Sequence, residues 1–136
     1  MAAVSQGARE GGGRAIGVTV ELLTQSRSPN PWLDQEIRTA ALLERIDKLI
    51  ELGDGYAVLP GGAGTLLELG AVWNLALLGA IQSKPIVVVG MGWERVLRTM
   101  IENLHTLEGD LSFLTLAPTA EAAAEILAER LRPPPP

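Results

Sequence analysis

A glycine-rich segment at residues 60–65 is the most informative part of this sequence for chemistry. It reads Pro-Gly-Gly-Ala-Gly-Thr, follows an apolar run at residues 56–59 and opens a long apolar stretch at residues 65–81. Glycines let the backbone turn sharply and approach a ligand, and the amide groups at a helix N-terminus attract an anion. The segment therefore predicts a phosphate site where a strand leads into a helix. No Gly-Lys-Ser/Thr follows, which excludes a Walker loop, and a tight turn without any ligand gives the same pattern.

Three charged residues are candidates to act beside this segment. Glu68 falls in the first turns of the helix, where the positive helix end favours its ionised form. It either contacts a bound sugar and stabilises an oxocarbenium-like transition state, or is an ordinary acidic residue at a helix start. Arg38 and Arg45 border the apolar stripe of a helix predicted over residues 33–52. Either they meet an anion, or they pair with Glu44 or Glu68, or their stems are buried while their heads reach water.

Alternating strands and helices must position these residues. Apolar runs bounded by turn residues predict strands at residues 15–20, 56–59, 85–89 and 111–116. Apolar periodicity predicts helices at residues 33–52, 65–81, 93–104 and 119–131. Two of the strands are apolar almost throughout, which is typical of a parallel sheet buried on both faces. The expected fold class is therefore α/β with a doubly wound parallel sheet.

The same pattern predicts one domain over residues 1–132, followed by a proline tail at residues 133–136. A short helical piece at residues 2–9 precedes the first strand, whereas a doubly wound sheet normally begins with a strand. Either the domain has four strands, or an initial strand–helix–strand portion lies upstream of Met1. The helix at residues 65–81 is apolar nearly all round, so we expect a homodimer partner on its outer side. Trp73 and Trp93 are expected in the core or in an interface.

Composition excludes several classes of function. The chain has 136 residues, with 11 Lys and Arg against 16 Asp and Glu, no Cys and one His. Without thiols or a second imidazole we expect no metal site, and His105 is expected at the surface. The formal charge of −5 gives no basic surface for nucleic acid. No apolar run is long enough to span a membrane and no signal peptide is recognisable, so a cytoplasmic protein is expected.

The segment from Pro60 to Glu68 resembles the PGGxGTxxE motif of the LONELY GUY (LOG) family. Its members are cytokinin-activating phosphoribohydrolases and related nucleotide nucleosidases, long labelled lysine decarboxylases. The resemblance implies a Rossmann-like, three-layer fold that lacks its usual N-terminal strand–helix–strand unit. It also implies Arg45 and Glu68 as the catalytic pair and a phosphate held by Gly61, Gly62, Gly64 and Thr65. Ile46 stands where the family has a lysine beside this arginine.

The reaction that the resemblance implies is hydrolysis of the N-glycosidic bond of AMP or an N6-modified AMP. The products are the free base and ribose 5-phosphate, and no cofactor is needed. A related branch of Rossmann-like proteins with similar glycine loops carries molybdenum cofactor or other phosphorylated pterins without chemistry. A binding protein of that kind is the alternative, and a subunit stabilised only by dimerisation is a third reading.

Overall fold

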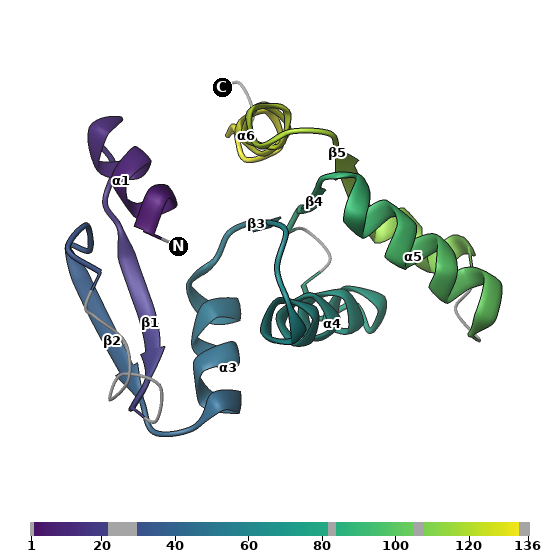
Figure 1. Ribbon diagram of the computed structural model, residues 1–136, viewed down its shortest axis with the longest axis horizontal. Helices are drawn as coiled ribbons and strands as arrows, with labels where there is room; N and C mark the ends of the chain where they lie inside the picture. The colour runs from purple at the N-terminus through teal and green to yellow at the C-terminus, as the bar shows by residue number, and fades with distance from the viewer. Residues whose placement is uncertain (1, 22–29, 82–83, 105–107, 134–136) are drawn as a thin grey trace. The chain divides into compact units, whose positions relative to one another are not determined.

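The computed structural model describes residues 2–21, 30–81, 84–104 and 108–133 (Figure 1). The chain forms two compact units, Met1–Leu52 and Gly53–Pro136, and each is described by itself below. Every strand pairs in parallel with its neighbour, in two open sheets flanked by helices. The predicted α/β class with a Rossmann-like arrangement of parallel strands is therefore confirmed. Among the described residues, no helix is long and apolar enough to cross a membrane.

The first unit contains a two-stranded sheet and two helices. Its elements are α1 (Ala2–Glu10), β1 (Ile16–Val20), β2 (Gln35–Thr39) and α3 (Leu42–Leu52). The two strands pair from Ile16 opposite Gln35 to Val20 opposite Thr39. α3 packs against both strands and buries Ile46. The helix expected at residues 2–9 is present as α1.

Strand β2 corrects the helix predicted over residues 33–52. That prediction is wrong before Leu42, because residues 35–39 extend along β1. β2 pairs only with β1, and three of its five side chains are exposed, so its sequence Gln-Glu-Ile-Arg-Thr carries little apolar alternation. The strand is fixed by Thr39, which is buried and whose hydroxyl donates to the carbonyl of Thr19 at 2.9 Å. This contact joins residues distant in the sequence, so no local pattern predicts it.

The second unit contains the glycine-rich segment. Its three strands are β3 (Tyr56–Val58), β4 (Ile86–Val89) and β5 (Leu114–Ala117), in the order β3-β4-β5. Its helices are α4 (Ala63–Leu77), α5 (Met91–Asn103), the 3-10 helix η1 (Glu108–Phe113) and, after the last strand, α6 (Ala120–Arg130). The strand expected at residues 111–116 begins later, because η1 occupies its first residues.

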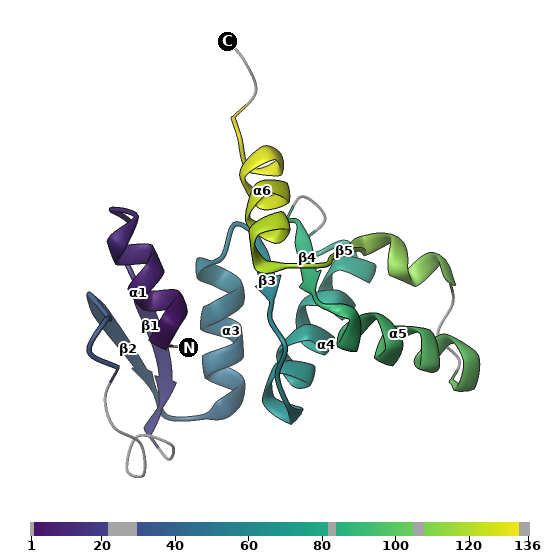
Figure 2. The same ribbon diagram turned by 45° about the horizontal axis from the view of Figure 1, so that its top comes forward.

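Two helical layers enclose the sheet of the second unit. α6 covers one face, and α4 and α5 lie on the other (Figure 2). β4 is buried along its whole length between them. Val87 and Val89 pack with Ala117 and Ala123 on the α6 side, and because side chains alternate along a strand, Ile86 and Val88 face the other layer. The carboxyl ends of β3 and β4 therefore share one fixed edge, from which the glycine-rich segment leaves.

Candidate functional site: a glycine loop that opens helix α4

The loop between β3 and α4 is shaped by a close approach at Gly61. A Cβ on Gly61 would lie 2.7 Å from the Cβ of Thr65 and would overlap its Oγ1. Only glycine leaves room for the threonine to fold back over the loop, since Cβ atoms essentially never approach so closely. Gly61 and Thr65 therefore set the path of the chain into the helix.

The N-terminus of α4 carries no cap from its own side chains. Gly62 is the N-cap residue, and no side-chain cap hydrogen bond forms there. The first intrahelical bond runs from the Leu66 amide to the Gly62 carbonyl at 3.0 Å, so the amides of residues 62–65 precede it. In contrast, the hydroxyl of Thr119 caps α6 by accepting a bond from the Ala122 amide at 3.2 Å. The start of α6 is thus closed by a side chain, whereas the start of α4 is suited to an external anion.

Two further glycines leave the space in front of α4 open. Within the described part of the chain, no atom other than those of the neighbouring residues and of the helix backbone lies within 4 Å of a Cβ placed on Gly62 or on Gly64, and both residues are exposed. Their φ angles are not in the left-handed region, so the backbone does not demand glycine at either position. The absence of side chains here gives a ligand direct access to the amides, which is the property expected of the predicted phosphate site.

Glu68 lies one turn further along α4. It is half-buried, next to Leu69, which is almost fully buried and fixes this part of the helix. Glu68 follows Gly64 by four residues and Thr65 by three, so all three share one helix face. Side chains on a helix lean toward its N-terminus, so the carboxylate leans toward the open glycines. An anion at the helix start and this carboxylate can therefore contact neighbouring parts of one ligand.

Arg45 and Arg38 lie in the first unit, and the structure separates them. Arg45 is on α3, half-buried, and its Nε donates to the carbonyl of Val18 in β1 at 2.8 Å. Arg38 is on β2, exposed, and its Nε donates to Glu36 at 2.8 Å. This hydrogen bond is the main cause that lowers the pKa of Glu36. The predicted helix that placed Arg38 beside Arg45 is wrong, because Arg38 lies in β2 and Arg45 in α3. The pairing of Arg45 with Glu68 stays a prediction.

A second glycine turn lies beside the first at the same sheet edge. β4 ends at Val89, and the next residue, Gly90, has φ +95° and serves as N-cap of α5, again without a side-chain cap. Its amide donates to the carbonyl of Ala117 at 2.8 Å, and a Cβ there would lie 3.7 Å from Cγ of Pro60. Gly90 is not among the residues predicted for the site from the sequence. The sequence feature that could have indicated this second turn is a glycine directly after a buried strand.

The remaining predictions concern the two tryptophans, the histidine and the absence of a metal site. Trp73 and Trp93 are buried, as expected. His105 lies outside the described residues. Within the described ranges, no three His, Cys, Asp or Glu side chains are grouped so as to hold a metal ion.

The chain is similar to known proteins of one family. Residues 1–127 match the model of a family described as possible lysine decarboxylase. The cytokinin riboside 5'-monophosphate phosphoribohydrolase of Mycobacterium tuberculosis is 38% identical over 89 residues, which cover 65% of this chain and 47% of that protein. The cytokinin riboside 5'-monophosphate phosphoribohydrolase LOG3 of Arabidopsis thaliana is 30% identical over 135 residues, which cover 95% of this chain and 62% of that protein.

The chain spans about half the length of the curated relatives it matches, 47% of the mycobacterial protein and 62% of LOG3. The family match itself runs through α1, both sheets and most of α6. It includes the glycine loop, Glu68 and Arg45, the residues on which the sequence resemblance rested. The chain therefore belongs to the family of possible lysine decarboxylases, the LOG family.

Proposed function

We propose that this chain hydrolyses the N-glycosidic bond of a nucleoside 5′-monophosphate, AMP or an N6-modified AMP. The observation that carries the proposal is the face of α4 that combines an uncapped, glycine-lined N-terminus with Glu68 one turn away. A 5′-phosphate is joined to its ribose by one methylene group, and one helical turn rises about 5.4 Å. A phosphate on the amides therefore brings the sugar next to the carboxylate. The names of the relatives support the same substrate class.

The chemistry assigned to each group follows from its charge. The amides of residues 62–65 and the positive end of α4 bind the phosphate and fix the ribose. The carboxylate of Glu68 stabilises the positive charge that develops on the ribose as the bond between C1′ and the base nitrogen breaks. The oxygen of a water molecule bonds to C1′, the base leaves with the electron pair of the broken bond, and one proton of the water ends on the base. The products are the free base and ribose 5-phosphate.

The test is chromatographic detection of free base after incubation of the 136-residue chain with AMP and with an N6-substituted AMP. Adenosine, which has the same glycosidic bond and no phosphate, is the matched control. We expect base release from the nucleotides and at least a hundredfold less from adenosine, because the nucleoside lacks the group that the helix start binds. Equal release of base from the nucleotides and from adenosine would contradict the role of the glycine loop in binding the phosphate. Phosphate binding without release would favour the carrier of a phosphorylated ligand over the hydrolase.

We also propose that a second copy of the chain covers the outer face of α4 in a homodimer. This face exposes Leu66, Leu67 and Leu77. Leu78, the C-cap residue of α4, is 74% exposed and extends it. Apolar side chains aligned on one exposed helix face favour association with another apolar surface.

The substitution Leu78→Lys is expected to convert the dimer to a monomer in sedimentation velocity at micromolar concentration. A lysine at a helix C-terminus is favourable for the monomer, so the effect isolates the interface. Leu131→Lys is the control, because Leu131 is the C-cap of α6 in the same backbone conformation. A wild-type chain that sediments as a monomer would contradict this assembly.

A further inference from the structure

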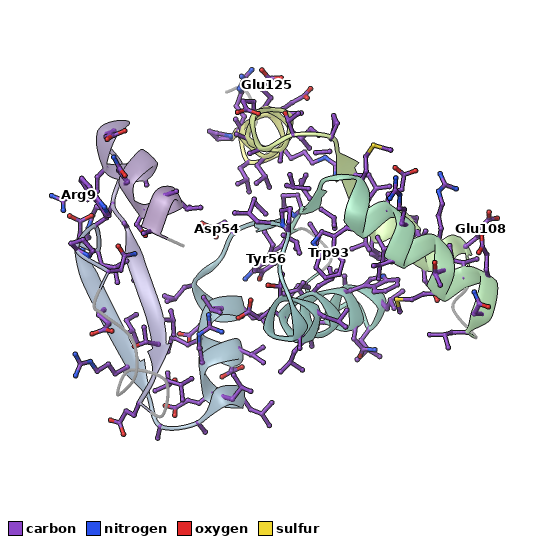
Figure 3. All side chains as sticks on the ribbon, in the orientation of Figure 1. Arg9, Asp54, Tyr56, Trp93, Glu108 and Glu125 are labelled. Carbon is purple, nitrogen blue, oxygen red and sulfur yellow. The ribbon has the colours of Figure 1, made fainter. Side chains whose placement is uncertain are left out.

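The point at which the chain leaves β3 for the glycine loop is held by a side chain from another helix. Nε1 of Trp93, in the first turn of α5, donates to the carbonyl of Leu59 at 3.1 Å. Leu59 immediately precedes Pro60, the first residue of the loop. Trp93 is buried at 7% exposure, and Figure 3 shows its side chain pointing from α5 into the interior of this unit.

This hydrogen bond lies just beyond the last residue of β3 that pairs with β4. The pairing of β3 with β4 ends at Val58 opposite Val88, so Leu59 lies one residue beyond it. The indole N–H supplies a donor to its carbonyl in place of a further strand residue. The next residue, Pro60, faces Gly90 of the neighbouring turn, whose amide is fixed to Ala117. The indole bond from α5 therefore holds Leu59, the residue that leads into the phosphate loop, and the N-cap residue of α5 lies opposite the next one.

We propose that Trp93 is a positioning residue for the phosphate-binding loop, an inference that rests on the proposed function. The direction of the amides at residues 62–65 depends on where the chain departs from the sheet. Glu68 is held separately by its neighbour Leu69, buried in the core at 2% exposure. Loss of the indole bond therefore loosens the phosphate contacts and leaves the carboxylate in place. A change of this kind weakens binding of ground state and transition state alike, which raises KM without lowering kcat.

Trp73 provides a matched control within the same unit. It lies on α4, is also 7% exposed, and its Nε1 donates to the carbonyl of Asp110 at 2.8 Å. This bond fixes the later part of α4 against η1 rather than the loop. Trp73→Phe and Trp93→Phe each remove one indole N–H bonded to a backbone carbonyl and keep an aromatic ring. The two variants differ in which backbone segment is released.

We expect Trp93→Phe to raise KM for AMP, and Ki for inorganic phosphate as a competitor, about three- to tenfold, the change that loss of one hydrogen bond produces. Its kcat stays within about twofold, since the reacting groups are unchanged. Trp73→Phe changes KM and Ki by less than about twofold, while both variants lower the midpoint of thermal unfolding. An equal KM for the two variants, or a fall in kcat alone for Trp93→Phe, overturns the inference.

A binding measurement on the unaltered chain tests the same inference independently of turnover. The three tryptophans give three indole signals in a ¹H–¹⁵N correlation spectrum, and loss of a signal in each Phe variant assigns Trp73 and Trp93. Titration with inorganic phosphate is expected to shift the Trp93 signal and leave the Trp73 signal in place. An unmoved Trp93 signal at saturating phosphate contradicts the positioning role. A shifted Trp93 signal in a chain that releases no base contradicts the proposed hydrolysis and supports the positioning role.

Discussion

Replacement of Glu68 by glutamine is expected to lower kcat for base release from AMP by at least about a hundredfold, with KM changed by less than about threefold. Glutamine keeps the size of the side chain and removes its negative charge. The charge acts mainly when the ribose becomes positive, so its loss raises the barrier more than it weakens ground-state binding. Losses of about 10²- to 10³-fold are typical when one preorganised electrostatic contact to a transition state is removed.

Glu125→Gln is the matched control for this experiment. Glu125 is an exposed glutamate on α6, which covers the opposite face of the same sheet (Figure 3). The same loss of charge there is expected to leave kcat and KM within experimental error. If Glu68→Gln kept more than a third of the wild-type kcat, Glu68 would have no role at the transition state. Steady-state kinetics with quantified base release distinguishes these results.

Substitution of Gly64 by alanine is expected to weaken binding of AMP and of inorganic phosphate about ten- to a hundredfold without destabilising the protein. Apart from the helix's own backbone and the chain neighbours, the described residues bring no atom within 4 Å of the added methyl group, so the fold accommodates it. Alanine also has the higher helix propensity, so the free energy of unfolding stays equal or rises by up to about 1 kcal/mol. The methyl group occupies the space that a phosphate needs, and charge-assisted hydrogen bonds lost there are worth about 1.5–3 kcal/mol.

Alanine substitutions at two other glycines serve as controls for this prediction. Gly7 lies in α1 with the same open surroundings, so Gly7→Ala is expected to match the stability effect and leave phosphate binding unchanged. At Gly61 the methyl group would collide with Thr65, so Gly61→Ala is expected to lower stability as well as binding. Isothermal titration calorimetry gives the affinities, and urea unfolding gives the stabilities. Unchanged affinity in Gly64→Ala would show that the space in front of α4 is not the phosphate site.

The sequence was sufficient to predict those features that depend on interactions between residues close together in the chain. The strand at residues 86–89 reads Ile-Val-Val-Val and is buried throughout, as a strand between two helical layers must be. The glycine loop and the start of α4 follow from glycine geometry and helix-end electrostatics, and both act within a few residues. The chain pattern therefore located the candidate phosphate site and Glu68 without tertiary information.

Edge strand β2 could not be predicted from the local sequence pattern. Its five residues are mostly polar because only β1 pairs with them, and their charges resemble those of a solvent-exposed helix face. The strand exists because its backbone completes a ladder with β1 and because Thr39 is bonded to Thr19. Arg38 consequently faces outward and pairs with Glu36, which a helical periodicity could not reveal.

The sequence by itself thus determined the α/β class, the loop that opens α4 and the placement of Glu68 one turn along the same helix face. These features depend on backbone preferences and side-chain spacing within single elements. The tertiary structure alone decided that Arg45 donates to Val18 and that Trp93 donates to Leu59. Each of these contacts joins residues far apart in the chain. Their partners are backbone carbonyls, which every residue carries, so only the folded path of the chain selects which carbonyl is reached.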